Sequence, residues 1–292
     1  MCMKINQWIE KNFNDLDGKL IAITGASGDI GRELCDILGS RRANLLLINR
    51  SESKTNKLKE DLLSKYDIKI NSVLIDFENF ESVKNGLTEI AKYKIDTLIL
   101  NAGAYKIERR KSDIGYDNVF QINFVSQYYL ARKVLDNGCD HLVAVSSIAH
   151  NYSKINLEDI DFSLNNKASK VYGNSKRFLM FSLYELFKKY NDKTLSIVHP
   201  GITYTNITSH YPKIIFKIIK YPMKVIFARL RKATVSIAVG VYNKCNYHEW
   251  IGPKIFNVWG LPKKQLVKTC SNEESVKIGE IAEDIFNKVD LL

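Results

Sequence analysis

The sequence has few of the features that mark a secreted, metal-binding or membrane-spanning protein. Its five cysteines are scattered and form no C-x-x-C pair, so neither a metal site nor a disulfide framework is expected, and a reducing compartment is favoured. Its five histidines show no metal-ligand spacing either. No run of about 18 uninterrupted apolar residues occurs, so no membrane-spanning helix is expected. The opening residues, MCMKINQWIEKNF, lack the apolar region of a secretory signal, and a cytoplasmic protein is predicted.

Acidic side chains are in the minority, with 32 Asp and Glu against 43 Lys and Arg, which gives a net charge of +11. Such an excess can attract nucleic acid, anionic lipid or a polyphosphate ligand, and a lysine-rich, solvated surface produces it as well. We expect no nucleic-acid partner, because the three tryptophans are better explained as packing residues than as platforms for bases. The sequence shows no repeat or linker and is 45% hydrophobic, so residues 1–292 are predicted to form a single domain.

Short apolar runs rich in Ile, Val and Leu predict strands at 19–24, 44–49, 70–76, 96–101, 141–146, 194–199 and 254–259. They are typical of parallel strands that are buried on both faces. Segments with helical spacing lie at 30–38, 54–66, 119–134, 172–187 and from 272 onward. This alternation predicts an α/β fold: a Rossmann-type, doubly wound parallel sheet of about seven strands with helices on both faces.

The stretch TGASGDIG, residues 24–31, follows the first predicted strand, where open α/β sheets bind their ligands. Gly25 permits a tight turn, and Gly28 and Gly31 allow close approach of the backbone and of the next helix. The N-terminus of that helix then faces a pyrophosphate. Asp29 is out of place beside a phosphate, so its side chain is expected either to point outward or to cap the helix.

The second predicted strand ends in Asn49 and Arg50 and carries no acid at its end. An NAD-selective site usually has Asp or Glu here to bind the ribose hydroxyls. An arginine instead suits a 2′-phosphate. We therefore predict NADP as the cofactor in preference to NAD.

The stretch YGNSK, residues 172–176, places Tyr172 and Lys176 four residues apart on one face of a helix. A phenol has an unperturbed pKa of about 10, and a neighbouring ammonium is expected to lower it. The pair therefore predicts a general acid or base acting on a carbonyl or an alcohol. A Y-x-x-x-K pair also occurs by chance on surface helices, so other motifs must support this interpretation.

Such motifs follow one another in the order typical of one family, and from about Leu16 to Gly260 the chain resembles the short-chain dehydrogenases/reductases. The motifs are the glycine loop, Asp76 in LIDFEN, NAG at 101–103, Asn123 in FQINFVSQYYL, Ser147 in VAVSSIAH, YGNSK, and HPGITYT at 199–205. The spacing of 25 positions from Ser147 to Tyr172, and the stretch YGNSKRFLMFSLYELFKKY, resemble the retinol-dehydrogenase-like branch. The loop departs from the usual T-G-x-x-x-G-x-G, and its spacing resembles that of the extended branch.

The resemblance implies catalysis by Tyr172, Lys176, Ser147 and Asn123. Tyr172 would exchange the proton, Lys176 would lower its pKa and hold the nicotinamide ribose, Ser147 would bind the substrate oxygen, and Asn123 would position a water. The residues implied to bind the cofactor are Gly25, Ser27, Gly28, Ile30, Gly31, Arg50, Asp76, Phe77, Asn101, Ala102, Gly103, Tyr172, Lys176, Pro200, Gly201, Ile202 and Thr205.

The segment HYPKIIFKIIKYPMKVIFARLRK, residues 210–232, has seven basic residues and no acid. The resemblance implies a substrate lid at about 205–235 that would line a pocket for a lipophilic substrate. A second interpretation is an interfacial helix on an anionic membrane, which would make the protein peripheral. Pro222 predicts two short helices in preference to one long helix.

The leading hypothesis is thus an NADP(H)-dependent oxidoreductase that interconverts a carbonyl and an alcohol on a small, lipophilic molecule. A regulatory, non-catalytic protein that binds NADP on the same fold is the alternative. The resemblance also makes a homo-oligomer an open expectation. A nucleic-acid binder, suggested only by the charge, ranks last.

Overall fold

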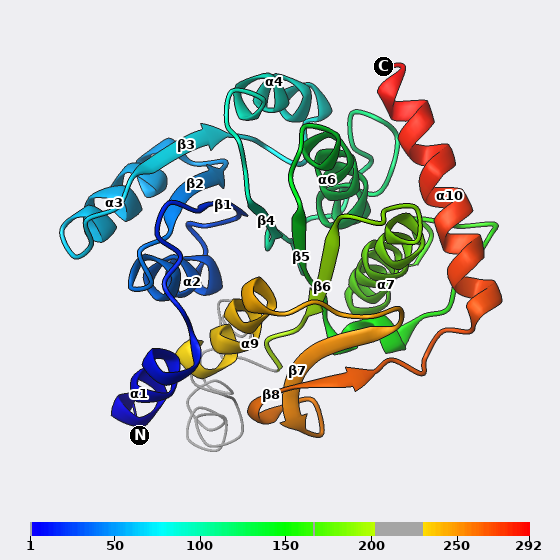
Figure 1. Cartoon of the computed structure of the whole chain (residues 1–292). Coiled ribbons are helices and arrows are strands. Elements are labelled where there is room, and N and C mark those ends of the chain that lie inside the picture. Colours follow the sequence, from blue (N-terminus) through cyan, green and yellow to red (C-terminus); the bar gives the residue numbers. More distant parts are fainter. Residues whose placement is uncertain (1, 166, 202–229) are drawn as a thin grey trace, which may run out of the picture.

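The computed structural model describes residues 2–165, 167–201 and 230–292, and Figure 1 shows their arrangement. Eight strands form one sheet in the order β3-β2-β1-β4-β5-β6-β7-β8. Their bounds are β1 Leu20–Thr24, β2 Asn44–Asn49, β3 Ile70–Leu74, β4 Thr97–Leu100, β5 His141–Val145, β6 Thr194–Val198, β7 Glu249–Ile255 and β8 Trp259–Leu266. All neighbouring strands are parallel except β7 and β8. The predicted fold class is confirmed, with one strand more than expected.

The central strands are buried on both faces because helices cover the sheet on two sides. Successive residues of β1 point to different cores: Ala22 belongs to one hydrophobic cluster, while Ile21 and Ile23 belong to the other. The first cluster is covered by α4 Phe80–Ile90, α6 Ser126–Asp136, α7 Ala168–Phe187 and α10 Asn272–Asp290. The second is covered by α1 Cys2–Asn12, α2 Asp29–Gly39, α3 Glu52–Leu63 and α9 Leu230–Tyr242.

The predicted last strand at 254–259 was wrong. The chain instead forms a hairpin, in which β7 ends at Ile255 and β8 begins at Trp259. Phe256 and Asn257 lie in the turn with φ values of 51° and 57°. A left-handed backbone cannot continue a strand, so this apolar run turns the chain. β8 pairs antiparallel with β7 and ends the sheet.

The predicted helices correspond to α2, α3, α6, α7 and α10, and α10 begins at Asn272 as expected. The segment predicted at 119–134 is a continuous helical run with a π-turn inside it: α5 Asn118–Phe120, η1 Gln121–Val125 and then α6. Gly138, at φ 91°, follows the C-cap Asn137, so the helix ends a few residues beyond the predicted segment. Helices α1, α4 and α9 were not predicted.

The predicted substrate lid lies largely outside the described residues, as does nearly all of the basic segment 210–232. The described part, 230–235, forms the start of α9, where Ala233, Thr234 and Val235 are buried. In the part of the chain that the structure describes, no helix is long and apolar enough to cross a membrane. The same residues contain no group of three or more His, Cys, Asp or Glu that could hold a metal ion.

Candidate active site

The glycine loop between β1 and α2 is tightly packed where the sequence predicted a phosphate cradle. Gly25 has a φ of 66°, and a Cβ atom on it would lie 2.9 Å from the Cα atom of Ala102. A Cβ on Gly31 would lie 2.3 Å from the carbonyl oxygen of Gly25. Side chains are therefore excluded at both positions, and the backbone of the loop stays open toward the cleft.

The N-cap of α2 is Gly28, and Asp29 is the first residue of the helix. The Asp29 side chain is exposed at the rim of the cleft, so it does not cap the helix and matches the other alternative, an outward position. A carboxylate in the first turn of a helix is also favoured by the helix dipole.

Asn49 and Arg50, at the end of β2, have different roles. Asn49 is buried and holds the glycine loop: its Oδ1 accepts from Ser27 N at 2.9 Å, and its Nδ2 donates to Thr55 Oγ1 at 3.0 Å. The Arg50 side chain is 70% exposed, borders the cleft and lies 3.8 Å from an Asp76 oxygen. Arg50 is thus a cation available to a ligand in this cleft, whereas Asn49 is already engaged.

Thr24 fixes the NAG segment against the glycine loop. Its Oγ1 accepts from Asn101 N and Ala102 N, both at 2.9 Å, and Asn101 Nδ2 donates to the carbonyl oxygens of Thr24 and Gly25. The sequence did not single out Thr24, although it begins the TGASG motif. Its hydroxyl connects β1 to the loop after β4.

These segments enclose a cleft of about 690 Å³ beside the carboxyl ends of β1, β2 and β4. The residues predicted to bind the cofactor that line it are Gly25, Ser27, Gly28, Ile30, Gly31, Arg50, Asp76, Phe77, Asn101, Ala102 and Gly103. Of the other predicted residues, Pro200 and Gly201 follow β6, where Gly201 N donates to His199 Nδ1 at 3.0 Å. Ile202 and Thr205 lie outside the described residues.

Tyr172 and Ser147 meet beside Tyr105, a residue that lines this cleft and contacts the Tyr172 ring. Tyr172 lies near the start of α7 and is hydrogen-bonded to Ser147, which precedes η2 Ile148–Tyr152. Burial raises the pKa of the Tyr172 phenol to about 12, and the hydrogen bond with Ser147 acts in the opposite direction. Burial thus keeps the pKa of Tyr172 above its ordinary value in this structure, and the lowering of that pKa by Lys176 stays a prediction.

Lys176 is buried, and its Nζ donates to the carbonyl oxygen of Val145 at 2.9 Å. It lies 6.0 Å from the centre of the Tyr172 ring, so the two side chains share a face of α7 without a direct hydrogen bond. Burial lowers the pKa of the Lys176 ammonium to about 8. A Cβ on Gly103 would lie 3.4 Å from Lys176 Nζ and 3.2 Å from Asn123 Oδ1, so both groups adjoin the NAG segment.

Asn123 lies in the π-turn η1 and is fully buried. Its Oδ1 accepts from Ala104 N at 2.6 Å, and its Nδ2 donates to Ala104 O at 3.0 Å and to Ser175 Oγ at 2.9 Å. A π-turn disrupts the regular helical ladder and is frequent at functional sites. All four predicted catalytic residues are thus brought together, although by contacts that sequence spacing alone does not give.

Tyr105 is a residue that the sequence analysis missed. It lines the cleft and packs its ring edge-on against Tyr172, with ring centres 5.0 Å apart. Because the two tyrosines are far apart in the chain, no local pattern indicates their contact.

A buried polar network lies behind Ser147. Arg177 is 1% exposed and donates two hydrogen bonds to the Glu274 carboxylate at 2.6 and 2.9 Å, which ties α7 to α10. Arg177 also donates to the carbonyl oxygens of His150 and Thr269. His150 in turn lies 2.6 Å from the carbonyl oxygen of Ser147 through its Nδ1. The serine loop therefore rests on contacts from both α7 and the segment leading into α10.

We expect acidification from pH 6.5 to 5 to destabilise the protein. Burial lowers the pKa of His150 to about 4 and that of His199 to about 3. Both imidazoles stay neutral in the folded chain while they take up protons in the unfolded chain, so stability present above pH 6.5 is lost as the pH falls. Each contributes a slope of up to about 1.4 kcal/mol per pH unit.

Urea unfolding at intervals between pH 7.5 and 5 measures this slope. The variant His199→Phe should show a smaller slope of unfolding free energy against pH, by the contribution of one histidine proton. A free energy of unfolding that stays level or increases over this range would contradict the expectation.

The structure has a mostly parallel α/β sheet with a glycine-lined cleft at its carboxyl edge, and a Tyr, a Lys and a Ser lie near that cleft. This combination is typical of oxidoreductases that bind a dinucleotide. The chain belongs to the short-chain dehydrogenase family, whose model matches residues 19–213. It is 28% identical over 209 residues to short-chain dehydrogenase TIC 32 A of Brassica napus, and 23% identical over 205 residues to human retinol dehydrogenase 13. The resemblance to the family and to its retinol-dehydrogenase-like branch is thereby confirmed.

The match to TIC 32 A covers 64% of this chain and 65% of that protein. The match to human retinol dehydrogenase 13 covers 67% of this chain and 62% of that protein. The chain thus spans under two thirds of the length of these relatives. Among solved structures, an uncharacterized protein from Mycobacterium paratuberculosis superposes over 95% of this chain and 96% of its own, with a TM-score of 0.72 at 19% identity. A Sphingobium yanoikuyae short-chain dehydrogenase in complex with NADPH superposes over 77% of this chain and 84% of its own, with a TM-score of 0.60 at 19% identity. These likenesses show the fold.

Proposed function

We propose that the protein is an NADP(H)-dependent oxidoreductase that interconverts a carbonyl and an alcohol on a small, lipophilic molecule. The observation that supports this most directly is the hydrogen bond between Tyr172 and Ser147. The Tyr172 ring contacts Tyr105, which lines a cleft whose loop excludes side chains at Gly25 and Gly31. The open backbone of that loop and the adjoining α2 N-terminus fit a pyrophosphate. The protein named in one similar structure as an NADPH-dependent 3-quinuclidinone reductase has a related fold.

When bound, the nicotinamide supplies a hydride to the carbonyl carbon or accepts one from the alcohol carbon. In the direction of reduction, the Tyr172 hydroxyl donates its proton to the carbonyl oxygen, and in oxidation the phenolate takes that proton back. Ser147 Oγ donates a hydrogen bond to the same oxygen as negative charge develops there. The buried Lys176 and Asn123 lie beside Gly103, where Lys176 would hold the nicotinamide ribose and Asn123 a water.

The residues proposed to bind the cofactor are all of those predicted from the sequence, including Ile202 and Thr205. Purified protein incubated with NADPH and a panel of aldehydes and ketones, or with NADP and alcohols, tests the proposal through the absorbance of the reduced cofactor. Turnover of at least one member is expected. The absence of turnover together with the absence of dinucleotide binding would contradict the proposal.

The variant Arg50→Ala is expected to weaken NADPH binding by about 10- to 100-fold, because one charge-assisted hydrogen bond contributes about 1.5–3 kcal/mol. NADH has no 2′-phosphate, so its affinity should change far less. Fluorescence titrations with both dinucleotides measure the two dissociation constants. Arg42→Ala, which removes an exposed arginine paired with Asp17, is the matched control. Equal losses for NADPH and NADH would contradict the NADP preference.

Four further parts of the proposal concern the surroundings of the site and the organisation of the chain. The segment at about 205–235 would act as a substrate lid, and residues 210–232 would contact an anionic membrane surface from the cytoplasmic side. The chain would function as one domain and would form a homo-oligomer. Sedimentation with anionic and neutral vesicles tests the membrane contact, and light scattering of the purified protein tests the oligomer.

A further inference from the structure

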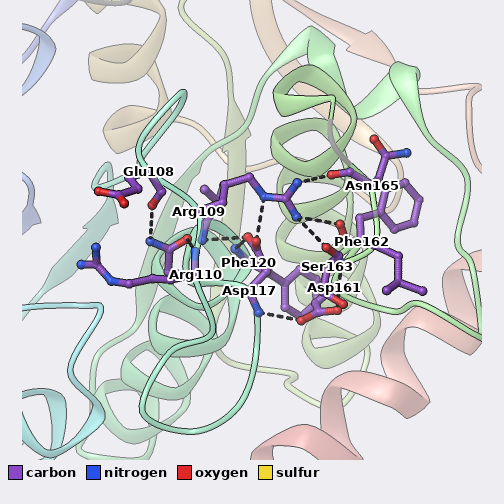
Figure 2. Close-up of polar contacts among 12 residues, drawn as sticks. Glu108, Arg109, Arg110, Asp117, Phe120, Asp161, Phe162, Ser163 and Asn165 are labelled. Carbon is purple, nitrogen blue, oxygen red and sulfur yellow. Dashed lines mark hydrogen bonds and ion pairs between the residues drawn. The ribbon is translucent and has the colours of Figure 1, made fainter.

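A single guanidinium joins the two loops that flank the candidate active site (Figure 2). Arg109, in the loop after β4, donates from Nη2 to the carbonyl oxygens of Phe162 at 2.8 Å and Ser163 at 3.3 Å, and from Nη1 to that of Asn165. These acceptors lie in the loop between η2 and α7, seven to ten residues before Tyr172. A planar group with five N–H donors can satisfy acceptors on several sides at once, which an ammonium cannot do.

The same guanidinium reaches the helix that carries Asn123. Arg109 Nε donates to Asp117 Oδ2 at 2.8 Å, and the Asp117 side chain is only 3% exposed. The other Asp117 oxygen accepts from Val119 N and Phe120 N, which caps α5 just before η1. The backbone N–H of Asp117 also donates to Asp161, so the two loops are joined a second time. The contacts of Arg109 and Asp117 are called the Arg109 clamp below.

Tyr105 lies on the clamped loop, four residues before Arg109. Its half-buried ring lines the cleft on one side and contacts the Tyr172 ring on the other, at an interplanar angle of 62°. A side chain in ring contact with the proton donor is within reach of the groups attached to the carbonyl that Tyr172 would protonate.

We propose that Arg109 is a positioning residue that holds Tyr105 against Tyr172, and that Tyr105 thereby limits the size of the carbonyl substituent that the site accepts. The proposal rests on the proposed function, because it concerns the substrate of that site. Tyr105 acts by direct contact and Arg109 acts through the loop. Removing the ring enlarges the space beside Tyr172, and weakening the clamp lets the ring move out of it.

The variant Tyr105→Ala is expected to raise kcat/KM for a bulky aryl ketone relative to a slender aldehyde by about 10-fold or more, as a change in pocket volume typically does. Arg109→Lys keeps the charge, so that Asp117 stays paired, but it loses the planar donor set. It should shift the same ratio in the same direction by a smaller factor. Steady-state kinetics with the two carbonyls at saturating NADPH measure the ratio.

The double variant separates positioning from general damage. If Arg109 acts through Tyr105, then Arg109→Lys has no further effect on the ratio in the Tyr105→Ala background. Arg42→Lys, at an exposed arginine that pairs with Asp17 at 2.8 Å, is the matched control and should leave the ratio unchanged. Additive effects in the double variant, or equal losses of activity on both carbonyls, would overturn the proposal.

Amide hydrogen exchange gives a readout that does not depend on turnover. Arg109→Lys should speed exchange at residues 104–118 and 161–165 relative to the Arg42→Lys control. If the wild-type protein turns over no carbonyl, the proposed function fails, whatever the exchange rates show. If the protein is active but exchange in the two loops and the substrate ratio are both unchanged, the Arg109 clamp has no positioning role.

Discussion

The variant Tyr172→Phe is expected to lower kcat by about 10²–10⁴-fold, the usual contribution of a positioned proton donor. The substitution removes the hydroxyl and keeps the ring that packs against Tyr105, so the site should stay folded. NADPH affinity should change far less than kcat, because the other residues of the proposed cofactor set are retained. Stopped-flow measurement of NADPH oxidation gives the rate, and fluorescence titration gives the affinity.

The pKa of Tyr172 sets the pH dependence of the two directions. Since burial raises this pKa to about 12, the phenol stays protonated through neutral pH, and the proton needed for carbonyl reduction is always present. Oxidation of the alcohol requires the phenolate, so its rate should increase with pH while the reduction rate does not. Full activity in Tyr172→Phe would reject Tyr172 as the proton donor. Dinucleotide binding without turnover of any carbonyl or alcohol by the wild-type protein would favour the regulatory alternative, in which dinucleotide binding alone is the function.

The variant Arg177→Met should lower the free energy of unfolding by about 3–5 kcal/mol, because it leaves the Glu274 carboxylate without its partner. Arg177 is 1% exposed and Glu274 is 15% exposed, so little water can replace the lost contacts. Most domains are stable by only about 5–15 kcal/mol, which makes this a large fraction of the total. Urea denaturation followed by circular dichroism measures the change.

Two companion variants show whether the uncompensated charge is the cause. Adding Glu274→Leu to Arg177→Met removes that charge and should restore much of the lost stability. Arg42→Met breaks an exposed ion pair and should cost no more than about 1 kcal/mol. If Arg177→Met is no more destabilising than Arg42→Met, the buried pair does not stabilise the contact between α7 and α10.

The parallel strands could be predicted from the sequence because each one is a short, continuous apolar segment, which by itself indicates a buried strand. A run such as NLLLIN, buried on both faces, leaves little choice of structure, and β2 has the predicted bounds of 44–49. The hairpin of β7 and β8 could not be predicted in this way, because its apolar residues lie in the turn as well as in the strands. Helix α4 mixes polar and apolar residues, and it buries only Phe80, Val83, Gly86 and Ile90.

The residues of the candidate site also divide into those found from local sequence motifs and those whose contacts depend on the fold. Motifs with fixed spacing led to Tyr172, Lys176, Ser147 and Asn123, and the structure brings these residues together. The pKa of Tyr172 could not be predicted, since it depends on burial and on the hydrogen bond with Ser147. Tyr105 and Arg109 were missed because Tyr172, the ring partner of Tyr105, and the carbonyl partners of Arg109 lie more than 50 residues away. Only the folded chain reveals these contacts.

The antiparallel strand at the end of the sheet restricts how two copies of the chain can associate. A neighbouring strand laid along β8 would meet Pro262, which has no N–H to donate, and the exposed Lys263 and Lys264. In a symmetric pair, those ammonium groups would face their own counterparts. A continuous intermolecular sheet through β8 is therefore disfavoured, and self-association should proceed through side-chain surfaces elsewhere on the protein.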